Sequence, residues 1–448
     1  MRDSTAPSAE GAANTRFPTL DHVWLAAALS IVVVRALAWP IIPSDFWWQL
    51  AYGRWIVENG TIPVVDHFSY LRSGQPYFDQ PWLAQVLMFW IYRVGGAALS
   101  LVALATLLFA TYALLLRLLV RTSGSVRFSA ALVILSLPVA MTNWSVRSQM
   151  FALPLFALYL VVLESWRTGR EGERSGHRLW VLPVAMVAWV NLHGSFVLGG
   201  ILIALYFLGE LGERRLARSR RSAADPGAGG RRGGERPLGQ LLLWGGLAAL
   251  AVFLNPAGPG VFRYVIGLVG NPAIQGIVEE WQAPTIGTVV GRLFFAWATL
   301  VGLAAILRRR WPDLVDICVL VAFFWLALGG ERHVMWFALA SLPFLARQIG
   351  AIFPAEAGAP VRQGRRALNL TFLGLMAFAV VLVLPPIKPH LSLPPEVRPL
   401  VSPDTPVASV AFLQSEPRRP GRLFHTEATG SYLMWAAPEQ GVFVDARV

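Results

Sequence analysis

The chain has 448 residues, of which 55% are hydrophobic and 14% charged, and its mean hydropathy is +0.53. A soluble globular domain rarely has this composition, and repeated apolar runs of about 20 residues identify a multi-pass membrane protein. The formal net charge of +12 comes almost wholly from arginine, since Lys388 is the only lysine. Because the arginines fall between the apolar runs, they indicate cytoplasmic loops that follow the positive-inside rule, and not a nucleic-acid-binding surface.

The apolar runs predict an all-α bundle of about 11 transmembrane helices. Residues 1–19 are polar and are interpreted as a disordered cytoplasmic leader, because the next apolar run is too long for the core of a signal peptide. The expected spans are 20–43, 97–120, 128–143, 148–165, 179–192, 194–212, 239–254, 290–307, 314–330, 334–348 and 367–385.

One apolar segment, residues 81–94, is not expected to cross the membrane. Its length is typical of a helix that lies flat at the membrane surface. If it crossed, every arginine-rich loop that follows would move to the outside, against the positive-inside rule. We therefore expect a large first outer loop over residues 44–96, within a transmembrane domain that runs from 20 to 385.

The remaining loops are assigned from composition. Residues 213–238 are rich in Gly and Arg and predict a flexible cytoplasmic loop, and residues 255–289 form an outer loop. Residues 386–407 are a Pro-rich linker, and residues 408–448 are expected to begin a small extracytoplasmic α/β domain with strands in GRLFHTE and GVFVDARV. So small a sheet would not be stable alone, so the domain either packs on the outer loops or is truncated, and we expect truncation.

Ionisable residues gather where the expected spans meet the outer face. Such groups are costly at membrane depth, so a set of them on one side suggests a functional site. The set comprises Asp45, Asp66, Asp79, Arg147, His193, Glu279, Glu280, Arg332 and His333.

The first of these residues opens a distinctive stretch, residues 44–70, which reads SDFWWQLAYGRWIVENGTIPVVDHFSY. An acidic residue directly after the first span, an aromatic helix over 46–59 and a flat helix over 81–94 resemble the first outer loop of the GT-C glycosyltransferases. The similarity to protein O-mannosyltransferases and to the catalytic subunit of oligosaccharyltransferase is looser. In the tail, Gly430, Tyr432 and Trp435 match the oligosaccharyltransferase WWDYG-type segment, but its Trp-Trp-Asp is missing, so peptide recognition is not carried over.

The resemblance implies that Asp45 is the essential first-loop acid, acting as a catalytic base or as a metal ligand. Many members carry an Asp-Glu pair at this point, whereas Phe46 follows here. The alternative for Asp45 is an N-cap of the helix 46–59. Asp66 is a second catalytic candidate, with a turn as its alternative. No cofactor is certain; a divalent metal ion, if one takes part, is expected at Asp45 and Asp66.

The resemblance also implies roles for the other polar residues. Arg147, His193 and Arg332 are candidates for binding the donor phosphate, with anchoring to lipid headgroups as the alternative. Four further residues are candidates for contacting substrate, with an interfacial aromatic belt or helix ends as alternatives. They are Trp48, Tyr52, Asp79 and Glu280.

These expectations define a glycosyltransferase that moves a sugar from a polyprenyl-phosphate-linked donor to a glycan, lipid or protein acceptor. It would be embedded in the bilayer of the bacterial cytoplasmic (inner) membrane, with its active face extracytoplasmic. The sequence contains no nucleotide-binding GxGxxG or P-loop, and no HExxH or Cys/His zinc spacing. Two alternatives stay open: a transporter or flippase of lipid-linked sugars, and a non-catalytic prenyl-sugar-binding component of a surface-polysaccharide system.

Overall fold

A computed structural model describes residues 18–169, 178–224, 238–271, 276, 278–307, 311–353, 365–415 and 421–447. Within these residues the fold is all-helical, with no β-strand and only isolated β-bridges. The expected leader lies outside the described residues except for its last two positions, and so do residues 225–237 of the expected Arg-rich loop.

A helix lies at each position where the sequence predicts a membrane span. Among the described residues, seven helical segments are long and apolar enough to cross a membrane, and α6, α8, α12 and α14 are shorter apolar helices. The count of about 11 crossings therefore stays a prediction. The helices are α1 (Leu20–Ala38), α3 (Trp82–Ser123), α4 (Val126–Ala140), α5 (Gln149–Thr168), α6 (Val181–Leu192), α7 (Phe196–Ala224), α8 (Leu238–Ala251), α11 (Val289–Ile306), α12 (Leu314–Leu328), α13 (Val334–Ile352) and α14 (Arg366–Leu382).

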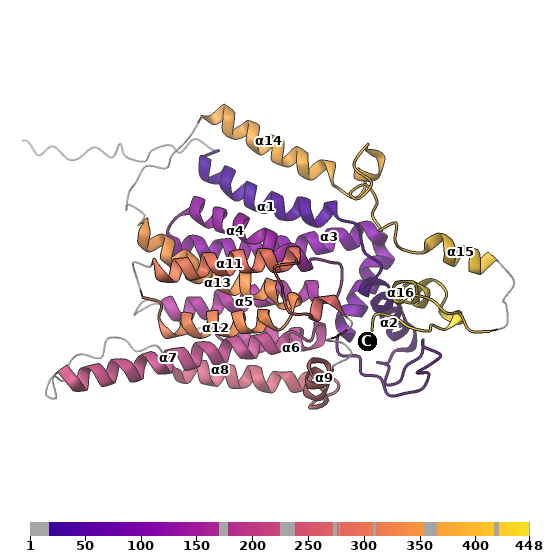
Figure 1. Cartoon of the computed structure of the whole chain (residues 1–448), viewed down its shortest axis with the longest axis horizontal. Helices are drawn as coiled ribbons and strands as arrows, with labels where there is room; N and C mark the ends of the chain where they lie inside the picture. The colour runs from indigo at the N-terminus through magenta and orange to yellow at the C-terminus, as the bar shows by residue number, and fades with distance from the viewer. Residues whose placement is uncertain are drawn as a thin grey trace, which may run out of the picture.

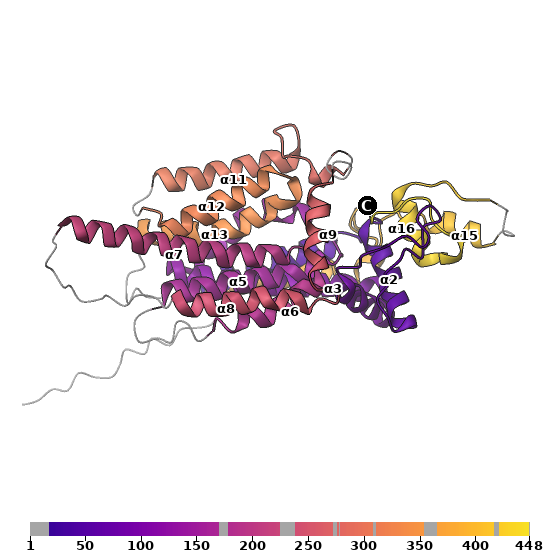
Figure 2. The ribbon, with the colours of Figure 1, turned by 90° about the horizontal axis from the view of Figure 1, so that it is seen from below.

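The long helices lie side by side in an elongated bundle (Figures 1 and 2). At one edge α14 packs on α1, at the opposite edge α7 packs on α8, and α3, α5 and α13 lie between. Large side chains such as Phe156, Trp166 and Trp189 are fully buried there. The helices α2 (Asp45–Asn59), α15 (Val407–Ser415) and α16 (Glu427–Ala436) gather at one end of the bundle.

The helix α3 is broken where the sequence predicts the flat helix to end and the span to begin. Gly95 and Gly96 have non-helical backbone angles, and Gly96 has φ +58° and ψ −150°. That conformation is open to glycine and strained for other residues. The first part of α3 supports α2 closely, because a Cβ on Gly53 would lie 2.1 Å from the carbonyl oxygen of Gln85.

The C-terminal segment differs from the expected α/β domain. Its two predicted strands are not formed in the described residues, and its regular elements are helices. Val442 instead bridges to the first outer loop, where its N–H donates to Phe68 O (2.9 Å) and its carbonyl accepts from Tyr70 N (3.1 Å). Arg54 of α2 also donates to Trp435 O at 2.9 Å. The segment thus satisfies its backbone groups against the outer loop rather than in a sheet of its own.

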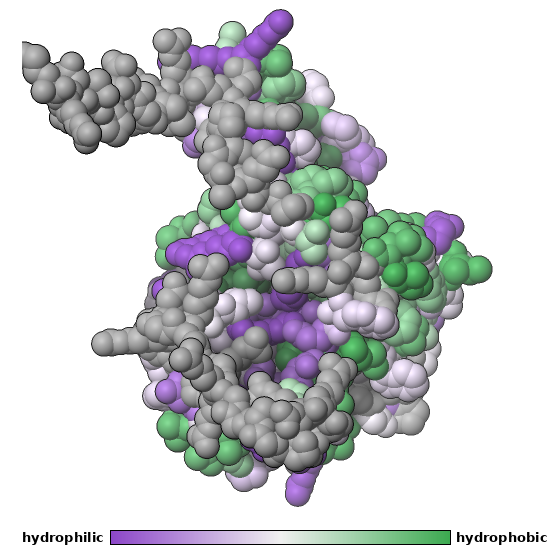
Figure 3. Space-filling view, turned by 90° about the vertical axis from the view of Figure 1, so that its left-hand side faces the viewer, coloured by the Kyte–Doolittle hydropathy of each residue, from purple (hydrophilic) through white to green (hydrophobic). Residues whose placement is uncertain are grey.

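The opposite end of the bundle corrects one loop assignment. The helix α7 continues to Ala224, so the first part of the expected 213–238 loop is helical. Arg167 in the last turn of α5 and Arg347 in α13 both pair with the buried Glu164, at 3.0 and 2.6 Å. Arg167 also pairs with Asp316 of α12 at 2.8 Å. These ion pairs join α5, α12 and α13, and Figure 3 shows hydrophilic side chains gathered at this end.

Candidate active site

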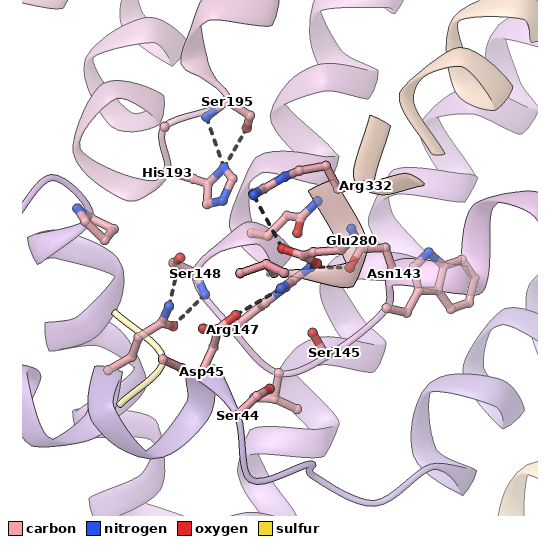
Figure 4. Close-up of a pocket in the computed structure, with 18 of the residues that line it drawn as sticks. Ser44, Asp45, Asn143, Ser145, Arg147, Ser148, His193, Ser195, Glu280 and Arg332 are labelled. Atoms are coloured by element: carbon pink, nitrogen blue, oxygen red, sulfur yellow. Dashed lines mark hydrogen bonds and ion pairs between the residues drawn. The ribbon is translucent and has the colours of Figure 1, made fainter. Parts of the chain in front are cut away.

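A cavity of about 700 Å³ opens at the end of the bundle that carries α2. Its wall combines apolar side chains of the spans with polar groups from α2 and from the loops at the same end of the bundle. It brings together seven of the site residues predicted from the sequence, most of them seen in Figure 4: Asp45, Trp48, Arg147, His193, Glu280, Arg332 and His333.

The charged side chains of the wall form a row of alternating sign. Arg147 Nη1 donates to Asp45 Oδ2 at 2.9 Å, and Arg147 Nη2 donates to Glu280 Oε2 at 3.0 Å. The other carboxylate oxygen of Glu280 lies 3.4 Å from Arg332 Nη1. Burial opposes the ionisation of Glu280, but Arg147 and Arg332 hold its pKa below the usual value. Two acids and two arginines thus neutralise one another across the cavity (Figure 4).

Asp45 is the first residue of α2 and borders the cavity. The N-cap of the helix is Ser44, and Asp45 does not cap the helix with its side chain; its Oδ1 accepts from the indole of Trp48 at 3.2 Å instead. The carboxylate is held from both sides, by Trp48 and by Arg147, and remains partly exposed. The capping alternative is therefore wrong for this side chain.

Arg147 is positioned by a pair of residues that the sequence interpretation missed. Gln49 Oε1 accepts from Ser148 N at 2.8 Å, and Gln49 Nε2 lies 3.2 Å from Ser148 Oγ. Both residues are buried, so this contact holds the segment before α5 against α2 (Figure 4). Gln49 lies four residues after Asp45 and hence on the same helix face, a spacing that could have indicated Gln49 but not its partner Ser148. Asn143 also accepts from Arg147.

His193 faces the same cavity as a neutral group. Burial, reinforced by Arg332 and Arg147, lowers the pKa of His193 to about 3. Its Nδ1 accepts from Ser195 N at 3.1 Å, which leaves Nε2 to carry the proton. His193 therefore offers a ligand one uncharged hydrogen bond, and not the positive charge expected of a phosphate-binding cation.

Asp66 and Tyr52 do not line the cavity. Asp66 accepts from the backbone N–H groups of Phe68 (2.9 Å) and Ser69 (3.0 Å), and it pairs with Arg447 at 3.0 Å. Burial raises the pKa of Asp66, but these hydrogen bonds and Arg447 lower it overall. Tyr52 accepts from the same arginine. The turn-forming alternative for Asp66 is thus the arrangement observed.

Asp79 lies beneath the cavity wall rather than in it. It is buried, one oxygen accepts from Gln85 Nε2 at 2.6 Å, and the other has no hydrogen-bond partner in the described part of the chain. Burial raises the pKa of Asp79 to about 7. Its neighbours Phe78 and Gln80 line the cavity in its place.

The divalent ion considered at Asp45 and Asp66 does not fit this arrangement. The two carboxylates engage different arginines, Arg147 and Arg447. Across the described ranges, no group of three or more His, Cys, Asp or Glu side chains is placed to hold a metal ion.

Comparison with known proteins finds structures of similar fold, but no family with a similar sequence. No protein-family model and no curated protein sequence matches the chain. A crystal structure of the oligosaccharyltransferase of Archaeoglobus fulgidus, tethered to an acceptor peptide with the NVT sequon, superposes with a TM-score of 0.52 and 14% identity. It covers 93% of this chain and 63% of that one. AglB of the same organism, in complex with an inhibitory peptide and a dolichol-phosphate, gives a TM-score of 0.51 and 11% identity, over 94% of this chain and 64% of that one.

These similarities confirm the resemblance at the level of fold: the chain has the GT-C fold of membrane glycosyltransferases. This chain spans less than two thirds of the length of those structures.

Proposed function

We propose that this protein is a membrane glycosyltransferase that moves a sugar from a polyprenyl-phosphate-linked donor to an acceptor on the extracytoplasmic side. The observation that carries the proposal is the position of Asp45. Its carboxylate is at the wall of a cavity of about 700 Å³, next to Arg147, in a GT-C fold. The neighbour AglB in complex with a dolichol-phosphate supports a lipid-linked donor.

Asp45 is the proposed base. An ionised carboxylate only accepts hydrogen bonds, and Trp48 and Arg147 leave part of this one open to the cavity. The acceptor oxygen gives its proton to Asp45 as it bonds to the anomeric carbon of the sugar. At the same time the bond between that carbon and the phosphate oxygen breaks, and the electron pair leaves with the polyprenyl phosphate.

Arg147 and Arg332 are the proposed partners of the departing phosphate. Negative charge grows on the leaving oxygen, and guanidinium groups in a site shielded from water stabilise such charge strongly. In the structure both arginines pair with Glu280. A bound phosphate would therefore compete with Glu280 for them, and His193 would add a neutral hydrogen bond.

The rest of the cavity suits the other parts of such a donor. Leu101, Leu104, Leu198 and Ile201 supply an apolar wall on which a prenyl chain could lie. Trp48, by its place beside Asp45, offers an aromatic face to a sugar ring. The mouth of the cavity leaves a route for the acceptor.

The experiment uses purified protein and synthetic polyprenyl-phosphate donors that carry radiolabelled sugars, with an envelope lipid and glycan fraction as acceptor. The proposal predicts label in a new product from at least one donor, and none from nucleotide sugars. A flippase would carry the donor across proteoliposome membranes unchanged. A binding component would retain the donor without product. Either of those results would replace the proposal.

A further inference from the structure

Arg35 lines the same cavity but was not singled out by the sequence. It lies in the last turn of α1, and Ala36, Trp39 and Ile42 line the cavity with it. Its guanidinium carbon lies 4.1 Å from the centre of the Trp39 ring. Within the described part of the chain, Arg35 stacks on Trp39 and pairs with neither a carboxylate nor another hydrogen-bond acceptor.

The other arginines of the cavity wall are already neutralised. Arg147 and Arg332 share Glu280, and Arg147 also engages Asp45. Arg447 pairs with Asp66 and Asp445. Among the described residues, Arg35 is thus the arginine of the wall that no carboxylate balances. An unpaired charge at the edge of a bilayer is costly, and an anion in the cavity would offset that cost.

The surroundings of Arg35 indicate which anion. Leu101 and Leu104 of α3, which packs on α1, line the cavity with it, so an apolar chain can lie close to the guanidinium. An anionic group joined to an apolar chain is a lipid phosphate, and guanidinium groups suit phosphate oxygens. A phospholipid headgroup offers the same chemistry, but Arg35 borders the cavity that also holds Asp45.

We propose that Arg35 binds the phosphate of the polyprenyl-linked donor. This inference rests on the proposed function and deepens it, since it assigns a donor-binding residue on the first span. Through Arg35 the phosphate gains a positive partner without first displacing Glu280 or Asp45. Arg147 and Arg332 can then engage the phosphate as the sugar leaves.

The test measures binding of a fluorescent synthetic polyprenyl monophosphate, without sugar, to purified protein in detergent. The variants are Arg35→Gln, Arg35→Lys and the matched control Arg93→Gln. Arg93 stacks on Trp90 at 5.0 Å but does not line the cavity. We expect Arg35→Gln to weaken binding about 10-fold or more, the Lys variant to retain most of it, and Arg93→Gln to match the wild type. Binding of uncharged polyprenol should be unchanged in all four proteins.

Three results would overturn the assignment. One is wild-type affinity of Arg35→Gln for the probe. If sugar transfer is still seen, this result contradicts only the role of Arg35 and not the proposed function. Another is displacement of the probe from the wild type by phosphatidylglycerol as readily as by polyprenyl phosphate, which would make Arg35 a headgroup contact. The third is a wild type that binds no polyprenyl monophosphate, which would count against the donor class as well. Unfolding temperatures of the variants separate loss of the site from loss of the fold.

Discussion

Three aspartates of the first outer loop differ in what surrounds each carboxylate. Asp45 accepts from two side chains and borders the cavity. Asp66 accepts from backbone amides and from Arg447, so it organises the loop. Asp79 is buried against Gln85. In the sequence all three are acids of one loop. Asp45 and Asp66 are distinguished by arginines from distant segments, Arg147 and Arg447.

The buried carboxyl of Asp79 predicts a pH dependence of stability. Its pKa rises from 3.8 in the unfolded chain to about 7 in the folded protein. Between these values the folded protein keeps a proton that the unfolded chain has lost, so stability falls as pH rises from about 4 to about 7. The total change is on the order of 4 kcal/mol. Asp79→Asn keeps an oxygen for Gln85 and carries no charge, so it should raise the unfolding temperature at pH 8 more than at pH 5.

The control for this prediction is Glu58→Gln, which neutralises an exposed carboxylate at the end of α2. Its effect on the unfolding temperature should be small and similar at both pH values. If Asp79→Asn has the same effect at pH 5 and pH 8, Asp79 does not titrate between them.

At the scale of elements, the site depends on how α2 is fixed. The contact of Gln49 with Ser148 joins α2 to the segment before α5, and Gly53 lets α2 approach the first part of α3. The break at Gly95 and Gly96 then separates that part of α3 from the span. Each contact sets the position of Asp45 relative to Arg147.

Gly96→Ala tests the break in α3. The backbone at this position has φ +58° and ψ −150°, which a side chain disfavours by about 1 to 3 kcal/mol. We expect a lower unfolding temperature in detergent. Gly374→Ala in α14 is the matched control: there a Cβ meets open space, and alanine favours a helix, so stability should not fall. Equal unfolding temperatures for Gly96→Ala and the wild type would mean that this conformation is not required.

At the scale of the whole molecule, orientation in the membrane decides where the chemistry takes place. The arginine-rich loops predict that the end opposite α2 is cytoplasmic, which would make the cavity extracytoplasmic. A reporter fused near residue 225 should therefore signal the cytoplasm, and one near residue 396 should signal the outside. The reverse pattern would place the cavity in the cytoplasm and exclude the proposed active face.

The sequence predicted most of the helices and only part of the site. Apolar runs predict helices directly. The helix 81–94 could be distinguished from a membrane span because it is short and because a crossing there would conflict with the arginine pattern. Asp45 and Arg147 lie 102 residues apart, and their contact depends on Gln49 and Ser148, which no local pattern reveals as a pair. The prediction of C-terminal strands was wrong for the same reason, since Val442 in the second of these segments pairs with a loop from the start of the chain.

The substitution Asp45→Asn tests the central claim most directly. Asparagine keeps the size of the side chain and an oxygen for Trp48, but it cannot take a proton from the acceptor. With purified wild type, Asp45→Asn and the control Asp404→Asn, whose carboxylate is exposed, we would measure transfer of labelled sugar from a synthetic polyprenyl-phosphate donor. The account predicts that transfer by Asp45→Asn falls about 100-fold or more while Asp404→Asn matches the wild type. Near-normal transfer by Asp45→Asn, with donor binding intact, would contradict the assignment of Asp45 as the base.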